Sequence, residues 1–135
     1  MKTTRDRNDI QQLETPAVLL DAAQLTSNLS SMQQRADRHG VALRPHVKTH
    51  KSLEIGRRQL ELGATGITVA TLDEAITFLQ GGFTSITIAR PMVSVIKWDR
   101  LFSVLGACEA EVRIVVDSEE GIQIAADRAT AANQQ

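Results

Sequence analysis

Basic and titratable side chains crowd into one short run of this sequence. The run reads Arg-Pro-His-Val-Lys-Thr-His-Lys and covers residues 44–51. Neighbouring positive charge and partial shielding from water both disfavour the ammonium form of a lysine. We therefore expect Lys48, flanked by Arg44, His46 and Lys51, to lose its proton more readily than an isolated lysine. A neutral amine is a nucleophile that can form a Schiff base with a carbonyl substrate or an aldehyde cofactor.

The same run has plainer interpretations. Charged clusters at strand ends are commonly solvated, and such a run can also simply bind an anion. His46 and His50, four residues apart, would suit a metal ion on a helix, but this stretch is expected to be extended and lacks a nearby carboxylate ligand. We therefore predict no metal site here.

Three other side chains are candidates for ligand binding or catalysis. Asp117 follows an expected strand, but capping the next helix is its simpler role. Arg90, beside Pro91, would either hold an anionic group or be an ordinary surface arginine. Cys108 has no basic neighbour in the sequence to activate it, so we assign it no role. We find no phosphate-cradling glycine pattern, nucleophile elbow or pair of zinc-binding cysteines.

The elements that must position these residues alternate between strand and helix. Apolar runs and helical spacing predict strands over residues 17–20, 41–48, 66–70, 85–89 and 111–116, and helices over residues 21–39, 52–62, 71–80, 94–105 and 117–129. Capping pairs are expected at Asp21 with Gln24, Thr71 with Glu74, and Asp117 with Glu120, while Gly40 ends the first helix. The last four strands, each followed by a helix, indicate βαβ units and a parallel sheet.

The expected strands carry unlike side chains on their two faces. Along residues 41–48, Leu43 and Val47 share one side, whereas Arg44, His46 and Lys48 share the other. Strands of an open, doubly wound sheet are apolar almost throughout, so this asymmetry favours a barrel with helices outside and a polar ligand inside. The active end of such a barrel is the carboxyl end of its strands. A (β/α)8 barrel needs about 250 residues, so we predict an α/β fold forming roughly half of one.

The amino-acid composition excludes several classes of protein. The chain has 135 residues, 42% of them hydrophobic, and a formal net charge of −1. These ordinary globular proportions argue against disorder, and the charge balance argues against a dedicated nucleic-acid binder. No apolar stretch is long enough for a membrane span, so no membrane partner is expected. One cysteine favours a reducing compartment, which predicts a cytoplasmic protein.

Four motifs together resemble a known family. They are Thr-Pro-Ala at residues 15–17, the basic run at 44–51, Gly-Ile-Thr-Val-Ala-Thr-Leu-Asp-Glu-Ala at 66–75 and Val-Val-Asp-Ser at 115–118. They resemble the D-threonine aldolase and D-serine dehydratase group of the alanine-racemase-like, fold-type III pyridoxal-phosphate enzymes. The resemblance runs from about Thr15 to about Ala126, the first third or so of a complete family member.

The resemblance implies a role for the basic run. Lys48 would form the Schiff base with pyridoxal 5'-phosphate and later accept a proton, and Arg44 and His46 are its expected companions in cofactor binding. The substrate would be a small D-β-hydroxy amino acid. The lyase would either break its Cα–Cβ bond, giving glycine and an aldehyde, or eliminate its β-hydroxyl, giving a keto acid and ammonia. The fold would be the amino-terminal half of a barrel of the alanine racemase type.

The sequence also departs from the family pattern. The phosphate-binding loops, the divalent-metal ligands and the β domain of complete members have no counterpart in these residues. We therefore expect low or no activity from the chain alone, with a non-catalytic cofactor-binding or inert half barrel, open to self-association, as the alternative. The expected organisation is a disordered leader over 1–14, the partial barrel domain over 15–132 and a tail over 133–135.

Overall fold

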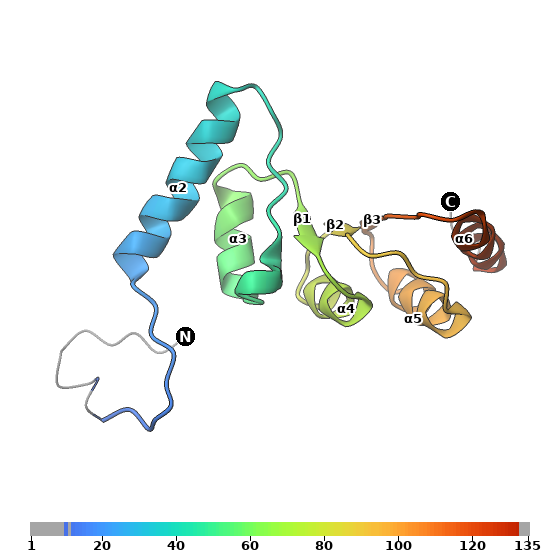
Figure 1. Cartoon of the computed structure of the whole chain (residues 1–135), viewed down its shortest axis with the longest axis horizontal. Helices are drawn as coiled ribbons and strands as arrows, with labels where there is room; N and C mark the ends of the chain where they lie inside the picture. Colours follow the sequence, from blue (N-terminus) through green and yellow to red (C-terminus); the bar gives the residue numbers. More distant parts are fainter. Residues whose placement is uncertain (1–9, 11, 133–135) are drawn as a thin grey trace.

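The computed structural model describes residue 10 and residues 12–132. Strands and helices alternate along them, and the helices α3 to α6 follow one another beside the sheet (Figure 1). The helices are α2 (Ala22–Arg38), α3 (Leu53–Glu61), α4 (Leu72–Gln80), α5 (Val95–Leu105) and α6 (Glu119–Ala131), the 3-10 helix is η1 (Val47–Thr49), and the strands are β1 (Ile67–Val69), β2 (Ser85–Ile88) and β3 (Glu111–Ile114).

The strands form a parallel sheet in the order β1-β2-β3. Ile67 pairs with Ile86, and Ile86 pairs in turn with Val112, so strands that are consecutive in the chain are neighbours in the sheet. This sequential order is the one a βαβ chain adopts when every helix returns over the same face. The α/β architecture predicted from the sequence is confirmed.

Side-chain caps fix where three helices begin, and the sequence predicts two of these caps, at Asp21 and Thr71. The Asp21 carboxylate accepts from the Gln24 N–H at 2.8 Å and starts α2, and Gly40 follows the end of α2 with a φ of 61°. Thr71 starts α4 by accepting from the Glu74 N–H at 3.2 Å. Ser52 does the same for α3. Each side chain satisfies an N–H that has no partner within its own helix.

The predicted cap of the last helix is wrong by one residue. Ser118, and not Asp117, is the N-cap of α6, and its hydroxyl accepts from the Gly121 N–H at 3.1 Å. Serine and aspartate cap equally well. The extended backbone continues past β3 through Ser118, so the serine, one residue later, takes the capping position.

Two predicted strands are not formed. Residues 41–48 make only an isolated parallel bridge, between His46 and Thr68, before the chain turns into η1. The carbonyls of Leu43 and Pro45 still accept from β1 and its approach, at 2.9 and 2.8 Å, so the segment lies beside the sheet. Proline has no N–H to donate, which limits a continuous ladder. Residues 17–20 pair with no strand in the part of the chain that the structure describes, and Val18 is fully exposed.

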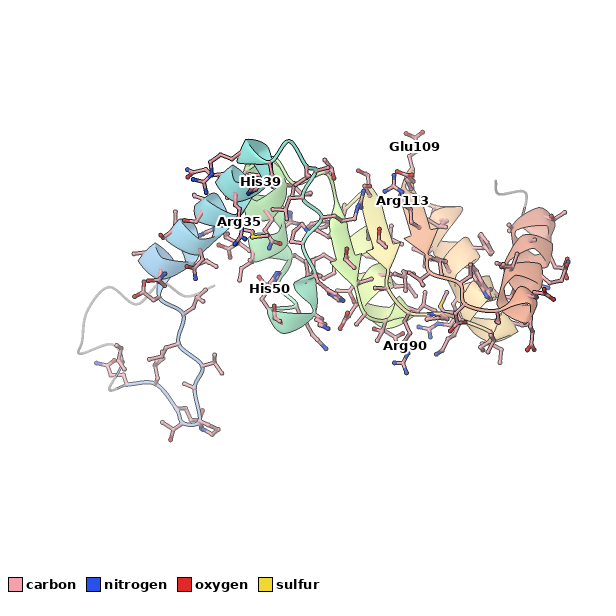
Figure 2. The ribbon with its side chains drawn as sticks, turned by 45° about the horizontal axis from the view of Figure 1, so that its top comes forward. Arg35, His39, His50, Arg90, Glu109 and Arg113 are labelled. Atoms are coloured by element: carbon pink, nitrogen blue, oxygen red, sulfur yellow. The ribbon has the colours of Figure 1, made fainter. Side chains whose placement is uncertain are left out.

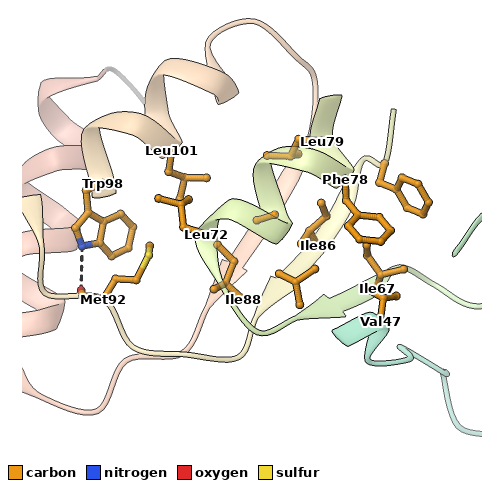
Figure 3. Packing of buried hydrophobic residues seen from close by; sticks show 13 residues of the cluster. Val47, Ile67, Leu72, Phe78, Leu79, Ile86, Ile88, Met92, Trp98 and Leu101 are labelled. Carbon is orange, nitrogen blue, oxygen red and sulfur yellow. Dashed lines mark hydrogen bonds between the residues drawn. The ribbon is translucent and has the colours of Figure 1, made fainter. Parts of the chain in front are cut away.

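The core lies between the sheet and the helices. Ile67, Val69, Ile86 and Ile88 are fully buried on the helical side of β1 and β2. Around them pack Phe78 and Phe83 edge to face at 4.9 Å, and Trp98, whose indole N–H donates to the Met92 carbonyl at 3.0 Å (Figure 3). Burying each such apolar side chain contributes about 1.5–3 kcal/mol. None of the helices in the described residues is long and apolar enough to cross a membrane.

The opposite face of the sheet has a different character. Thr68 and Thr87 are half-buried there, and Arg113 is exposed beside Thr87 in the strand register. The asymmetry predicted from the sequence is therefore present: one face is apolar and covered by helices, and the other carries small or charged side chains. Because His46 is level with Thr68 in the parallel register, His46 belongs to this second face.

Candidate functional site

Lys48 lies beyond the end of the paired part of its segment. His46 is level with Thr68 in the middle of β1, so Lys48, two residues further on, is near the carboxyl end of that strand. Val47 is completely buried in the core and anchors η1, whereas Lys48 is exposed. The local sequence thus puts one side chain into the core and turns the next one outward.

His46 holds the backbone of this lysine. Its Nδ1 accepts from the Lys48 N–H at 3.3 Å and caps η1. The ring is half-buried, close to the main chain of Lys48. The structure therefore brings together two of the residues that the sequence singled out. The contact shown is with the backbone, and cofactor binding by His46 stays a prediction.

His50 has the same arrangement one turn later. Its Nδ1 accepts from the Ser52 N–H at 3.1 Å, while its Nε2 is buried without a hydrogen-bond partner among the described residues. Burial lowers the pKa of His50 below its usual 6.5, and the Gln59 amide pulls it the other way. Both histidines thus point a ring nitrogen at main-chain N–H groups rather than at each other.

Arg44 lies at the other end of the strands. Its guanidinium donates to the Ser85 carbonyl at 3.1 Å and hydroxyl at 3.0 Å, and to the Thr65 carbonyl at 3.4 Å. Ser85 begins β2 and Thr65 precedes β1, so the structure does not bring Arg44 next to Lys48. Burial and the charge of Arg113 lower the pKa of Arg44, against an opposing effect of Glu111. Its predicted role in cofactor binding gains no support from this position.

An ion pair that the sequence analysis did not predict joins the basic run to the next unit. Lys51 Nζ lies 3.1 Å from Glu74 Oε1, and the Ala70 N–H donates to Glu74 Oε2 at 2.8 Å. Burial, the largest single effect, raises the pKa of Glu74, but the hydrogen bond from Ala70 and the Lys51 charge together outweigh it and lower the pKa. Glu74 was recognisable only as part of a capping pair.

Two of the remaining candidates follow the carboxyl ends of strands, as Lys48 does, and no hydrogen bond or ion pair among the described residues joins either of them to Lys48. Arg90 and Asp117 are exposed, each after the carboxyl end of a strand, and Figure 2 shows Arg90 at the end opposite Glu109 and Arg113. Cys108 is half-buried, with its thiol against the Val104 carbonyl at 3.4 Å. In the described part of the chain, no three His, Cys, Asp or Glu residues gather to hold a metal ion.

A cavity of about 550 Å³ lies between α5, α6 and β3. Apolar side chains such as Trp98, Leu101 and Ile114 line it, and none of the sequence-predicted site residues does. It belongs to the helical side of the sheet. The chemistry of the basic run therefore has to be sought on the other side, at the ends of the strands.

Comparison with curated proteins gives relatives of one kind. The chain is 40% identical over 115 residues to a D-threonine aldolase from Arthrobacter sp, a match that covers 84% of this chain and 29% of that protein. It is 49% identical over 80 residues to the D-threo-3-hydroxyaspartate dehydratase of Delftia sp. (strain HT23), covering 59% of this chain and 21% of the relative. The chain thus spans less than a third of the length of these relatives.

Two solved structures that resemble this chain belong to proteins of the same two kinds. The D-threonine aldolase of Filomicrobium marinum superimposes with a TM-score of 0.86 at 31% identity, over 90% of this chain and 32% of that one. The Delftia dehydratase gives a TM-score of 0.84 at 36% identity. These are alanine-racemase-like barrel proteins, of which this chain matches about a third. The family model described as "Alanine racemase, N-terminal domain" matches residues 20–135. The chain therefore belongs to the family of alanine racemase N-terminal domains.

Proposed function

We propose that this chain carries the cofactor-binding lysine, Lys48, of a pyridoxal 5'-phosphate-dependent lyase acting on D-β-hydroxy amino acids. Its similarity to a D-threonine aldolase and to a D-threo-3-hydroxyaspartate dehydratase supports this class. The observation that carries the proposal is the setting of Lys48: an exposed amine near the carboxyl end of a parallel strand, on a turn whose backbone His46 holds.

The residues present fit the aldehyde end of this cofactor. An aldehyde needs an accessible amine, and Lys48 is exposed near the carboxyl end of β1. When bound, the cofactor supplies a ring that withdraws electrons from the substrate α-carbon. Lys48 would also be the residue that accepts and returns a proton of the substrate. Arg44 is already engaged by carbonyls at the far end of the strands, so we assign the phosphate contacts elsewhere in a complete family member.

The test is chemical labelling of the lysines. Borohydride reduces a lysine–pyridoxal linkage to a stable secondary amine, and peptide mapping then locates it. We expect label on Lys48 in the wild-type chain, loss of that label in Lys48→Ala, and unchanged labelling in the control Lys97→Ala, which removes an exposed lysine of α5. Label spread equally over the lysines, or concentrated on another lysine, would contradict the proposal.

A second candidate is non-catalytic. It is a half barrel that binds the cofactor without turning over a substrate, or that does neither; the chain spans 29% to 32% of the aldolase relatives. Labelling at Lys48 without turnover would support a binding module. Absence of both would support an inert one.

A further inference from the structure

We propose that Glu74 is a positioning residue for Lys48: its carboxylate clamps the turn that carries the lysine onto the carboxyl end of β1. This inference rests on the proposed function, because it explains how the amine of Lys48 is held for its cofactor. Glu74 lies in α4, and no hydrogen bond or ion pair among the described residues joins it to Lys48 itself. It acts through Lys51 and through the backbone of Ala70.

The two oxygens of Glu74 serve different segments. Oε1 pairs with Lys51 Nζ at 3.1 Å, and Oε2 accepts from the Ala70 N–H at 2.8 Å. Ala70 directly follows β1, whereas Lys51 closes the turn after η1. A single carboxylate thus connects two consecutive junctions of strand and helix. The Glu74 side chain is only 12% exposed, whereas that of Lys51 is 65% exposed, so water reaches this ion pair from the lysine side and the hydrogen bond from Ala70 is its better shielded contact.

Lys51 completes the turn around Lys48. Its N–H donates to the Val47 carbonyl at 2.8 Å, so the ends of the turn meet on either side of the lysine. Lys51 adopts a φ of 47°, a left-handed conformation that side-chain-bearing residues rarely take. Such a conformation persists where surrounding contacts over-determine it. The ion pair with Glu74 is one such contact, and the pKa of Glu74, lowered below 4.5, keeps the carboxylate charged at neutral pH.

A second ion pair of the chain provides a matched control. Arg58 and Glu54 pair at 2.8 Å within α3, with side chains 39% and 43% exposed. That pair joins two positions of one helix and bridges no turn. Breaking it removes a surface charge contact of the same chemistry and leaves the segment around Lys48 untouched.

The test compares variants of the full 135-residue chain in two measurements. One is the rate of borohydride-trapped labelling of Lys48 by pyridoxal 5'-phosphate, and the other is hydrogen exchange at the N–H groups of Lys51 and Ala70. We expect Glu74→Gln and Lys51→Met to slow labelling of Lys48 by about tenfold or more, since a displaced group loses its reactive geometry, and to speed exchange at Lys51. Lys51→Arg should restore both values, and Arg58→Met should change neither.

The outcomes separate this inference from the proposed function. If wild-type Lys48 is labelled and Glu74→Gln is labelled equally fast, with unchanged exchange, the positioning role is overturned and the function stands. If wild-type Lys48 is not labelled, the proposed function fails. Exchange at Lys51 then decides whether Glu74 restrains the turn: faster exchange in Glu74→Gln supports the clamp, and equal exchange overturns it. Lys51 is 65% exposed, so its variants test the clamp without disturbing the core.

Discussion

Lys48 is restrained in its backbone and exposed in its side chain. His46 accepts its N–H, and the buried Val47 before it anchors the turn in the core. The basic run draws attention to this lysine in the sequence, because charge density is visible in a linear pattern. The expected shielding and the nearby Arg44 charge are not found, since Lys48 is exposed and Arg44 is held at the opposite end of the strands. The contribution of Glu74 was not, because its partner Lys51 is distant in sequence and only the fold brings the two together.

Protonation of His50 is expected to lower the stability of the folded chain in acid. Burial lowers its pKa, so the folded chain binds a proton less readily than the unfolded chain does. The free energy of unfolding should therefore fall as the pH drops through 6.5, the usual value, and level off below the folded pKa.

The variant His50→Asn keeps an acceptor for the Ser52 N–H and removes the titration. Urea unfolding between pH 8 and 5, at about half-unit steps, should show a shallower loss of stability for this variant than for the wild type. The exposed His39 provides the control His39→Asn. Identical pH profiles for His50→Asn and the wild type would show that burial of His50 does not matter to folding.

At the scale of elements, local signals predicted helices better than strands. The caps at Asp21, Ser52 and Thr71 start helices because their side chains satisfy nearby N–H groups, which is a property of adjacent residues. Strand pairing depends on distant partners. The alternation of segment 41–48 therefore predicts a strand, yet the segment forms one bridge, since Pro45 cannot donate and the Lys48 N–H donates to the His46 ring.

The junction before β1 should tolerate only glycine. A Cβ on Gly66 would lie 2.6 Å from the Ser85 carbonyl oxygen and 2.7 Å from Arg44 Cζ, and the φ of 154° is itself unfavourable for other residues. We expect Gly66→Ala to destabilise the chain by roughly 1–3 kcal/mol in urea unfolding. It would push the Arg44 guanidinium away from the start of β2.

Gly106→Ala is the matched control for this substitution. Gly106 has a φ of −63°, and a Cβ there would meet its nearest neighbour at 3.5 Å, an ordinary contact. Its stability should be unchanged or slightly raised. Equal stabilities of the two variants would mean that Arg44 moves aside at no cost.

At the scale of the whole molecule, the chain is much shorter than the relatives it resembles. The chain covers 32% of the aldolase of Filomicrobium marinum, and its β3 pairs on one side only within the described residues. Residues 1–9, 11 and 133–135 lie outside the description, so the leader predicted over 1–14 and the tail over 133–135 stay predictions, as does the domain over 15–132.

We expect the isolated 135-residue chain to turn over D-threonine and D-serine at most very slowly, even with pyridoxal 5'-phosphate and a divalent metal. A reactive amine contributes little to turnover unless other groups bind the substrate and the phosphate, and this chain spans 29% of the aldolase from Arthrobacter sp. Assays for glycine from D-threonine and for keto acid from D-serine check this and separate aldolase from dehydratase chemistry. Turnover at the rate of a complete enzyme would refute it, and loss of that turnover in Lys48→Ala would assign it to this site.

The two faces of the sheet have different roles in the protein. Apolar side chains under the helices, such as Ile67 and Ile86, maintain the fold, whereas Thr68 and Thr87 on the open face contribute little to the core. Substitutions on the open face can therefore accumulate during evolution with little loss of fold stability. One scaffold can in this way diversify into relatives that share an architecture and differ in the bond they cleave.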